Sequence, residues 1–102
     1  MKSKEKIVEY LSSPVVIFIK GTKEMPQCGF SAQAIQILDI LDADYLDVDI
    51  LKDQDLRQDL KEYSAWPTYP QLYIKGELVG GIDIMKELMA EGELETMLFE
   101  NE

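Results

Sequence analysis

The fold is set by a stretch that reads VVIFIKGTKEMPQCGFSAQAIQILDIL over residues 15–41. Its first five residues, Val15–Ile19, are all apolar, which is typical of a central strand covered on both faces. A loop over residues 21–27 follows, and from Gly29 to about Leu41 apolar residues recur at helical spacing. The stretch therefore predicts a strand, a loop and a helix, with Cys28 at the point where the loop meets the helix.

Patterns on both sides extend this order. Residues 3–12 predict a helix with Ser3 as its N-cap and with Ile7, Val8 and Leu11 on one apolar face. After residue 41 we expect a strand over 45–50 and a helix that is marked by Leu56, Leu60 and Tyr63 and ends before Trp66. Two short strands over 71–75 and 78–79 follow, joined by a tight turn at Gly76-Glu77. The last expected element is a helix over 83–99, with Gly92 as a candidate break. This order, αβαβαββα, predicts an α/β protein of the thioredoxin-like fold, with a central four-stranded mixed sheet flanked by helices on both faces.

Charge and length exclude several classes of protein. The chain has 102 residues, with 10 Lys+Arg against 20 Asp+Glu, so its net charge is −10. Such a surface repels nucleic acid and anionic lipid, and we expect neither nucleic acid nor a membrane as partner. The longest apolar run is far shorter than the roughly 20 residues of a membrane helix. We expect one domain over residues 1–102. Because no targeting signal is visible, we expect a cytoplasmic protein or, as an alternative, an organellar matrix protein without its presequence.

Two residue counts narrow the chemistry. The chain has no histidine, which excludes Ser-His-Asp and Cys-His nucleophilic sites and zinc sites with histidine ligands. It has one cysteine, Cys28, so a disulfide, a Cys-x-x-Cys pair or a four-cysteine metal site cannot form within one chain. Any metal or cluster bound through Cys28 needs further thiolates from a second chain or from a small-molecule thiol. One cysteine without a bridge also fits a reducing compartment.

Cys28 is the candidate reactive group. It lies just before a helix, where unpaired N–H groups and aligned peptide dipoles favour an anion and lower the pKa of a thiol. Lys20, at the end of the preceding strand, adds positive charge nearby. The alternative is a buried cysteine that acts only as a small apolar residue. Its position between a proline-containing loop and a helix start favours the reactive thiol.

Three other features fit either a structural or a binding role. In the motif WPTYPQ at residues 66–71, a cis peptide before Pro70 would present backbone groups to an extended ligand, although an ordinary proline-rich connection explains the motif better when it is taken alone. In the motif GGID at residues 80–83, Asp83 is suited equally to capping the next helix and to accepting an ammonium group. Arg57, the only arginine, suits a carboxylate ligand, whereas a solvated helix residue is its simpler interpretation.

Taken together, these segments resemble the monothiol glutaredoxins of the Cys-Gly-Phe-Ser class, in their short single-domain form. The resemblance covers approximately residues 3–99. Its four motifs are Lys20-Gly21-Thr22, Pro26-Gln27-Cys28-Gly29-Phe30-Ser31-Ala32-Gln33, Trp66-Pro67-Thr68-Tyr69-Pro70-Gln71-Leu72-Tyr73 and Gly80-Gly81-Ile82-Asp83. Any one of these motifs is a weak signal, but four of them in the same order and spacing are highly specific.

The resemblance implies a thioredoxin-like fold that binds glutathione in an extended groove. The implied glutathione-binding residues are Lys20 and Arg57 for the glycine carboxylate, Tyr69 and Pro70 for the cysteinyl unit, and Ile82 and Asp83 for the γ-glutamyl end. Cys28 would be the active thiol or the cluster ligand. Ile82 stands where many family members have a second cysteine. A main-chain contact at this position survives the change, but a disulfide there is excluded.

The resemblance further implies a [2Fe–2S] cluster that bridges a homodimer. Such a cluster takes four thiolates, and two chains supply only two, one Cys28 each. The thiols of two bound glutathione molecules would complete the set. Ligation by a diffusible tripeptide suits a carrier that receives and hands on clusters in cluster biogenesis and iron homeostasis. In the family that the chain resembles, the usual partners are BolA-like proteins and recipient apoproteins.

A second hypothesis is an enzyme, a glutathione-dependent thiol–disulfide oxidoreductase. The Cys28 thiolate would take glutathione from a glutathionylated protein as a mixed disulfide, and a second glutathione would resolve it. Ser31 replaces the second cysteine of a dithiol site, so only a monothiol cycle is open, and it is expected to be slow in this class. A third hypothesis is a thioredoxin-like adaptor with an inert cysteine. The four motifs together favour the carrier.

Overall fold

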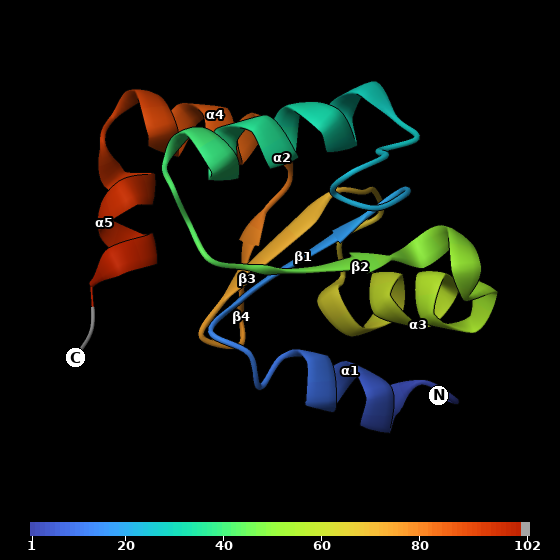
Figure 1. The fold of residues 1–102 in the computed structure, drawn as a ribbon. Coiled ribbons are helices and arrows are strands. Elements are labelled where there is room, and N and C mark those ends of the chain that lie inside the picture. Colours follow the sequence, from blue (N-terminus) through green and yellow to red (C-terminus); the bar gives the residue numbers. More distant parts are fainter. Residues whose placement is uncertain (101–102) are drawn as a thin grey trace.

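The computed structural model describes residues 1–100, and its centre is a four-stranded mixed sheet (Figure 1). The strands are β1 (Val15–Ile19), β2 (Leu46–Asp49), β3 (Gln71–Ile74) and β4 (Glu77–Gly80), in the spatial order β2-β1-β3-β4. The helices are α1 (Lys4–Tyr10), α2 (Gly29–Ile40), α3 (Gln54–Ser64), α4 (Ile82–Ala90) and α5 (Glu93–Phe99), with a short 3-10 turn at Ile50–Lys52. Strand β1 pairs in parallel with β2 and antiparallel with β3, and β3 pairs antiparallel with β4.

Helices cover both faces of the sheet. Figure 1 shows α2, α4 and α5 on one face and α1 and α3 on the other. All five side chains of β1 are buried, and they alternate between two cores. Ile17 packs toward α2 and α4, whereas Phe18 packs among Ile7 of α1 and Leu60 of α3. The predicted α/β thioredoxin-like fold, with a central β1 covered on both faces, is therefore confirmed.

The two helices on the second face differ from the sequence prediction at their margins. Ser3 lies at the N-cap position of α1, but its side chain makes no capping hydrogen bond, and its N–H donates instead to the Asp59 carboxylate. Val8 and Tyr63 were predicted to be part of the apolar faces, yet both are exposed. Only one row of each helix meets the sheet, and in α1 Ile7 fills that row. The predicted apolar faces were therefore too wide.

Several predicted boundaries also need correction. The second strand ends at Asp49, because the chain turns into the 3-10 segment at Ile50. The hairpin turn consists of Lys75 and Gly76, both with positive φ, since Ile74 pairs directly with Glu77. The break at Gly92 is confirmed, because this residue separates α4 from α5.

The strand pairing brings four segments to one end of the sheet. Phe18 near the end of β1 pairs with Gln71 at the start of β3, and Leu72 pairs with Gly80 at the end of β4. The end of β1, the segment before β3 and the start of α4 therefore meet, and α2 begins beside them (Figure 1). None of the helices within residues 1–100 is both long enough and apolar enough to cross a membrane.

Candidate functional site

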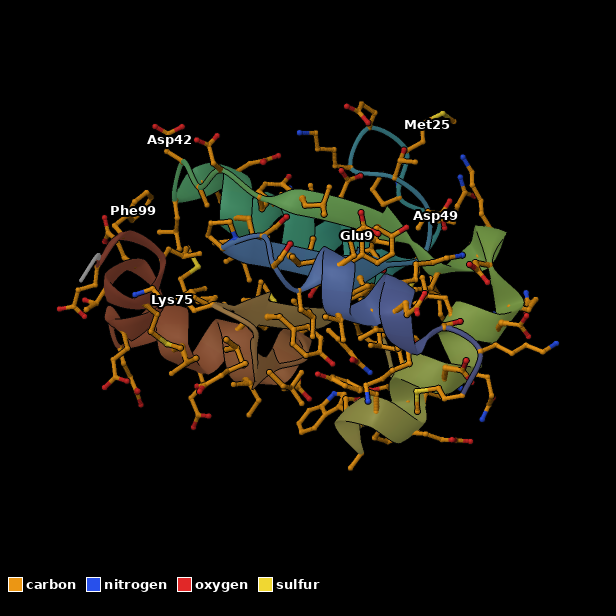
Figure 2. All side chains as sticks on the ribbon, turned by 90° about the horizontal axis from the view of Figure 1, so that it is seen from below. Glu9, Met25, Asp42, Asp49, Lys75 and Phe99 are labelled. Carbon is orange, nitrogen blue, oxygen red and sulfur yellow. The ribbon has the colours of Figure 1, made fainter. Side chains whose placement is uncertain are left out.

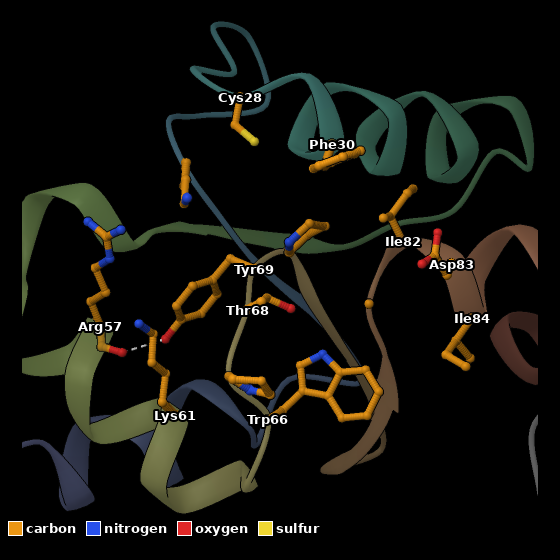
Figure 3. Close-up of a pocket in the computed structure, with 14 residues that line it drawn as sticks. Cys28, Phe30, Arg57, Lys61, Trp66, Thr68, Tyr69, Ile82, Asp83 and Ile84 are labelled. Carbon is orange, nitrogen blue, oxygen red and sulfur yellow. Dashed lines mark hydrogen bonds between the residues drawn. The ribbon is translucent and has the colours of Figure 1, made fainter.

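A pocket of about 400 Å³ opens at this end of the sheet (Figure 3). The seven residues that the sequence singled out all line it: Lys20, Cys28, Arg57, Tyr69, Pro70, Ile82 and Asp83. Figure 3 shows Arg57 and Asp83 on opposite sides of the pocket, with the sulfur of Cys28 pointing in between them. Residues that are far apart in the sequence therefore surround one cavity.

Cys28 lies at the start of α2, as predicted. It is half-buried and has an extended backbone, and it occupies the N-cap position without a capping hydrogen bond from its thiol. The pKa of the thiol is lowered, chiefly by the backbone N–H of Ser31, then by the N–H of Phe30 and the charge of Lys20, while partial burial opposes the shift. These groups stabilise the thiolate, so the predicted direction of the pKa shift is confirmed.

The loop that leads to Cys28 is closed on itself and fastened to β2. The Gln27 N–H donates to the Lys20 carbonyl at 2.8 Å, and the Gly21 N–H donates to the Asp49 carboxylate at 3.0 Å. Gly21 has a φ of +98°, and a Cβ at this position would lie 2.5 Å from the Met25 carbonyl oxygen, so a side chain does not fit. Figure 2 shows Met25 and Asp49 at the same end of the molecule.

Positive charge gathers on one side of the pocket. Arg57 and Lys61 stand one turn apart on α3 and both line the pocket, and Lys20 approaches from the end of β1. Leu56 and Leu60 of the same helix are buried in the core, so the next row of α3 faces the pocket. Three cations around one cavity stand out in a chain with a net charge of −10.

The wall opposite Cys28 is formed by the segment before β3. The Tyr69-Pro70 peptide bond is cis, so the ordinary proline-rich connection, which the motif favoured when taken alone, is wrong and the cis alternative is confirmed. Burial raises the pKa of Tyr69, so its hydroxyl stays protonated, and it donates a hydrogen bond of 2.7 Å to the Arg57 carbonyl (Figure 3). Within residues 1–100 the N–H and C=O of Tyr69 have no backbone partner. These two groups are thus available to pair with an extended ligand.

The third side of the pocket is the start of α4. Gly81 is the N-cap, and a Cβ there would lie 3.3 Å from the Pro70 carbonyl oxygen and from Trp66 Nε1, so the backbone packs closely on the opposite wall. The N–H groups of the first helical turn, beginning with Ile82, have no intrahelical partner. Asp83 is exposed in that turn and is not the cap, so its predicted capping role is wrong. Its carboxylate faces the pocket instead (Figure 3).

Several lining residues were not assigned to the site from sequence. Lys61, Phe30, Trp66 and Thr68 all border the pocket. The spacing of Arg57 and Lys61, four residues apart on a predicted helix, was a signal that would have linked the two cations. Phe30, two residues after Cys28, is 57% exposed although it is aromatic, and only the structure reveals this exposure.

A model of the glutaredoxin family matches residues 15–79, more than half of the chain. The chain belongs to the glutaredoxin family. Probable monothiol glutaredoxin 2 of Rickettsia typhi is 61% identical over 84 residues, which cover 82% of this chain and 76% of that relative. The protein of the same name from Rickettsia prowazekii is 52% identical over 101 residues, which cover 94% of each chain. Both relatives are named as probable monothiol glutaredoxins, in agreement with the motifs.

Solved glutaredoxin structures share the fold. Reduced poplar apo GrxS14 is 53% identical, with a TM-score of 0.76 over 92% of this chain and 84% of that one. The holo form of glutaredoxin C1 from Populus tremula x tremuloides is 30% identical, with a TM-score of 0.83 over 95% and 86%. A buckwheat glutaredoxin–glutathione complex is 26% identical, with a TM-score of 0.85 over 97% and 89%.

The donor set of this family member limits how it can bind a metal. Within residues 1–100, no group of three or more Cys, Asp or Glu side chains is placed to hold a metal ion. The chain contributes one thiolate, that of Cys28, at the rim of the pocket. A cluster held through this thiolate therefore fits only if other molecules supply the remaining ligands.

Proposed function

We propose that this monothiol glutaredoxin binds glutathione in the pocket and carries a bridging [2Fe–2S] cluster as cargo between two copies of the chain. One observation carries the proposal: the pocket has cations on one side, Asp83 and a helix start on the other, and the Cys28 thiol between them. Glutathione has carboxylates near both ends, an ammonium group at one end and a thiol in the middle. The charges of the pocket complement that pattern.

The cationic side suits the glycine carboxylate of glutathione. Arg57 offers a planar fork of donors that matches a carboxylate, and Lys20 and Lys61 add charge around it. Charge-assisted hydrogen bonds of this kind are stronger than neutral ones, and the Arg57 and Lys61 side chains are only partly exposed. We therefore assign Arg57, Lys20 and Lys61 to the glycine end.

The start of α4 suits the γ-glutamyl end. Its unpaired N–H groups, that of Ile82 first, face a carboxylate favourably, since the helix start also carries partial positive charge. The Asp83 carboxylate beside them accepts an ammonium group. This pairing of donors and acceptor matches the α-amino acid group at that end of glutathione.

The middle of the ligand would pair with Tyr69. The free N–H and C=O of Tyr69 are positioned beside Pro70 in the wall that faces Cys28. An extended peptide that pairs with them would place its cysteine thiol on the Cys28 side of the pocket. The buckwheat relative in complex with glutathione has the same fold, which supports this ligand class.

The cluster proposal follows from ligand arithmetic. Cys28 of two copies and the thiols of two bound glutathiones supply the four thiolates that a [2Fe–2S] cluster needs. The lowered pKa of Cys28 keeps its thiol ready to ligate, since the thiolate is the metal-binding form. Because half the ligands are diffusible, the cluster is held loosely enough to be passed on. BolA-like proteins and recipient apoproteins, in the cytoplasm, are the partners we expect from the family.

The lowered pKa of Cys28 also favours the second candidate function, a monothiol thiol–disulfide oxidoreductase. The Cys28 thiolate attacks the glutathione sulfur of a protein–glutathione disulfide, and the protein leaves as a thiolate. The thiolate of a second glutathione then attacks the Cys28-bound glutathione sulfur, which releases oxidised glutathione and regenerates the Cys28 thiolate. This route uses the same pocket but needs no iron.

Anaerobic reconstitution separates these functions. The protein is mixed with iron, sulfide and either glutathione or S-methylglutathione, followed by visible absorption, iron content and mass in solution. S-methylglutathione keeps both charged ends but has no free thiol, so it tests ligation apart from groove binding. We expect a coloured dimer that holds two irons when glutathione is present, and no such dimer when S-methylglutathione replaces it. A colourless monomer in both cases would overturn the carrier. Reduction of a mixed disulfide by that protein would then support the oxidoreductase.

A further inference from the structure

A fully buried glutamine lies directly behind the wall of the pocket. Gln71 begins β3 and is 0% exposed. Its Nε2 donates to the carbonyl oxygen of Trp66 at 3.1 Å and to that of Thr68 at 3.2 Å. Both acceptors belong to the segment that precedes the cis peptide, and both residues line the pocket. The amide therefore ties the start of β3 back to the pocket wall.

Tyr73 completes the hydrogen bonding of this amide. Its hydroxyl donates to Gln71 Oε1 at 3.0 Å, and both side chains are buried. Burial raises the pKa of Tyr73 to about 12, so the hydroxyl remains a donor at neutral pH. Both donors and one acceptor site of the Gln71 amide are thus used, which is what a buried polar group needs in order not to destabilise the fold.

The connection between this network and the ligand is short. Thr68, whose carbonyl accepts from Gln71, is adjacent to Tyr69, whose own N–H and C=O are free. A fully satisfied buried network makes a segment rigid, and preorganisation lowers the entropic cost of binding. The segment has few other side-chain supports: the described bonds are that of the Tyr69 hydroxyl to Arg57 and that of the Trp66 N–H to Ser64 Oγ.

We propose that Gln71 is a positioning residue, which with Tyr73 holds the segment of residues 66–68 so that the Tyr69 backbone is presented to glutathione. It touches no ligand itself, because it is fully buried behind the wall. This inference rests on the proposed glutathione binding. It assigns to Gln71 a role that is separate from that of the thiol, since none of the hydrogen bonds described within residues 1–100 joins Gln71 or Tyr73 to Cys28.

The test uses two variants and one matched control. Gln71→Met keeps the length and unbranched shape of the side chain but removes the amide. Tyr73→Phe removes only the hydroxyl and keeps the ring, so it folds even where the first variant does not. Tyr45→Phe is the control, because it deletes a hydroxyl that donates to Asp39 at 2.8 Å and does not line this pocket.

Three readouts distinguish positioning from general stability. Glutathione affinity, measured well below each variant's melting temperature, should fall about 10-fold in Gln71→Met and less in Tyr73→Phe. Quenching of Trp66 fluorescence by acrylamide should rise in both variants, because Trp66 is the only tryptophan and is held through its carbonyl. The pH profile of Cys28 alkylation should stay unchanged. Tyr45→Phe should match the wild type in all three.

The outcomes separate this inference from the proposed function. A wild-type protein that binds no glutathione would overturn both. Wild-type binding with unchanged affinity and unchanged Trp66 quenching in the two variants would overturn the inference alone, and would leave Gln71 a residue of stability only. A shift of the Cys28 alkylation profile in Tyr73→Phe would also contradict it, because the network would then act through the thiol.

Discussion

The Lys20 N–H donates a hydrogen bond of 3.1 Å to the hydroxyl of Ser31, a residue that is completely buried. This bond joins the end of β1 to the first turn of α2, across the loop that leads to Cys28. The backbone N–H of Ser31 is also the largest cause of the lowered pKa of the Cys28 thiol. Ser31 therefore organises the site from the position that a second cysteine occupies in a dithiol protein.

Ser31→Ala tests this relationship. The substitution leaves the Lys20 N–H without its acceptor, so the free energy of unfolding should fall by about 1–3 kcal/mol, measured by urea denaturation. Ser12→Ala is the control, because the Ser12 hydroxyl donates to Glu9 on the exposed surface, and its effect should stay within about 0.5 kcal/mol. Equal stability of the two variants would show that the Ser31 hydroxyl is not a structural tie.

The reactivity of Cys28 should depend on Lys20. The rate of iodoacetamide alkylation against pH should have its midpoint below the ordinary pKa of a cysteine, since the helix N–H groups and Lys20 favour the thiolate. Lys20→Gln removes a positive charge, so the midpoint should move to higher pH and alkylation near neutral pH should slow. Lys23→Gln, in the loop that follows Lys20, is the charge-matched control. If both variants move the midpoint equally, the effect is one of net charge.

Arg57→Gln should weaken glutathione binding. Loss of a charge-assisted contact to the glycine carboxylate predicts a Kd about 10-fold higher by titration calorimetry, with a weaker dependence on salt. The bond from the Tyr69 hydroxyl goes to the Arg57 backbone carbonyl and survives the substitution. Lys52→Gln changes net charge equally outside the pocket and should bind like the wild type. Identical affinities for the two variants would place the glycine carboxylate elsewhere.

Asp53 should give the stability a pH dependence of known sign. One of its oxygens caps α3 by accepting from the Leu56 N–H at 3.1 Å, and the other accepts from Lys6 at 2.6 Å. These bonds, that of Lys6 first, hold the pKa of Asp53 below its ordinary value. A lowered folded-state pKa stabilises the protein above about pH 4, the unfolded value, and this contribution is lost as the pH falls through the folded value.

Two variants separate the cap from the charge. Asp53→Ala should lower the free energy of unfolding by about 1 kcal/mol at pH 7, because the N-cap of α3 is lost. Asp53→Asn keeps a capping oxygen and should cost less. The difference in the free energy of unfolding between Asp53→Asn and the wild type should shrink as urea denaturation is repeated from pH 7 down to pH 3. A difference that grows toward pH 3 would contradict a lowered pKa of Asp53 in the folded protein.

The fold was largely predictable because its strongest signals are local. Five consecutive apolar residues, Val15–Ile19, indicate a strand buried on both faces, and a cysteine before a helical pattern indicates a thiol at a helix start. The exposed Val8 and Tyr63 were mispredicted because helical spacing does not show how wide a face the sheet covers. That width depends on contacts with distant residues.

Part of the pocket was also predictable from local signals in the sequence. Cys28 and Arg57 stand out because each is the only residue of its type in the chain. Lys61 is one of several lysines, and it lines the pocket only because α3 packs beside it. The role of Gln71 was hidden more completely. A glutamine after a proline gives no sign that it will be buried, or that its amide will bridge two carbonyls three and five residues back.

The proposed glutathione site is tested most directly by a glutathione titration of the reduced, iron-free protein, followed through the backbone amide NMR signals of the whole chain. We predict one glutathione per chain and amide shifts concentrated at Tyr69, Ile82 and Asp83 and around Cys28. Arg57→Gln should weaken this binding. Shifts that avoid these residues, or no saturable binding, would contradict a glutathione site in this pocket and the carrier function built on it.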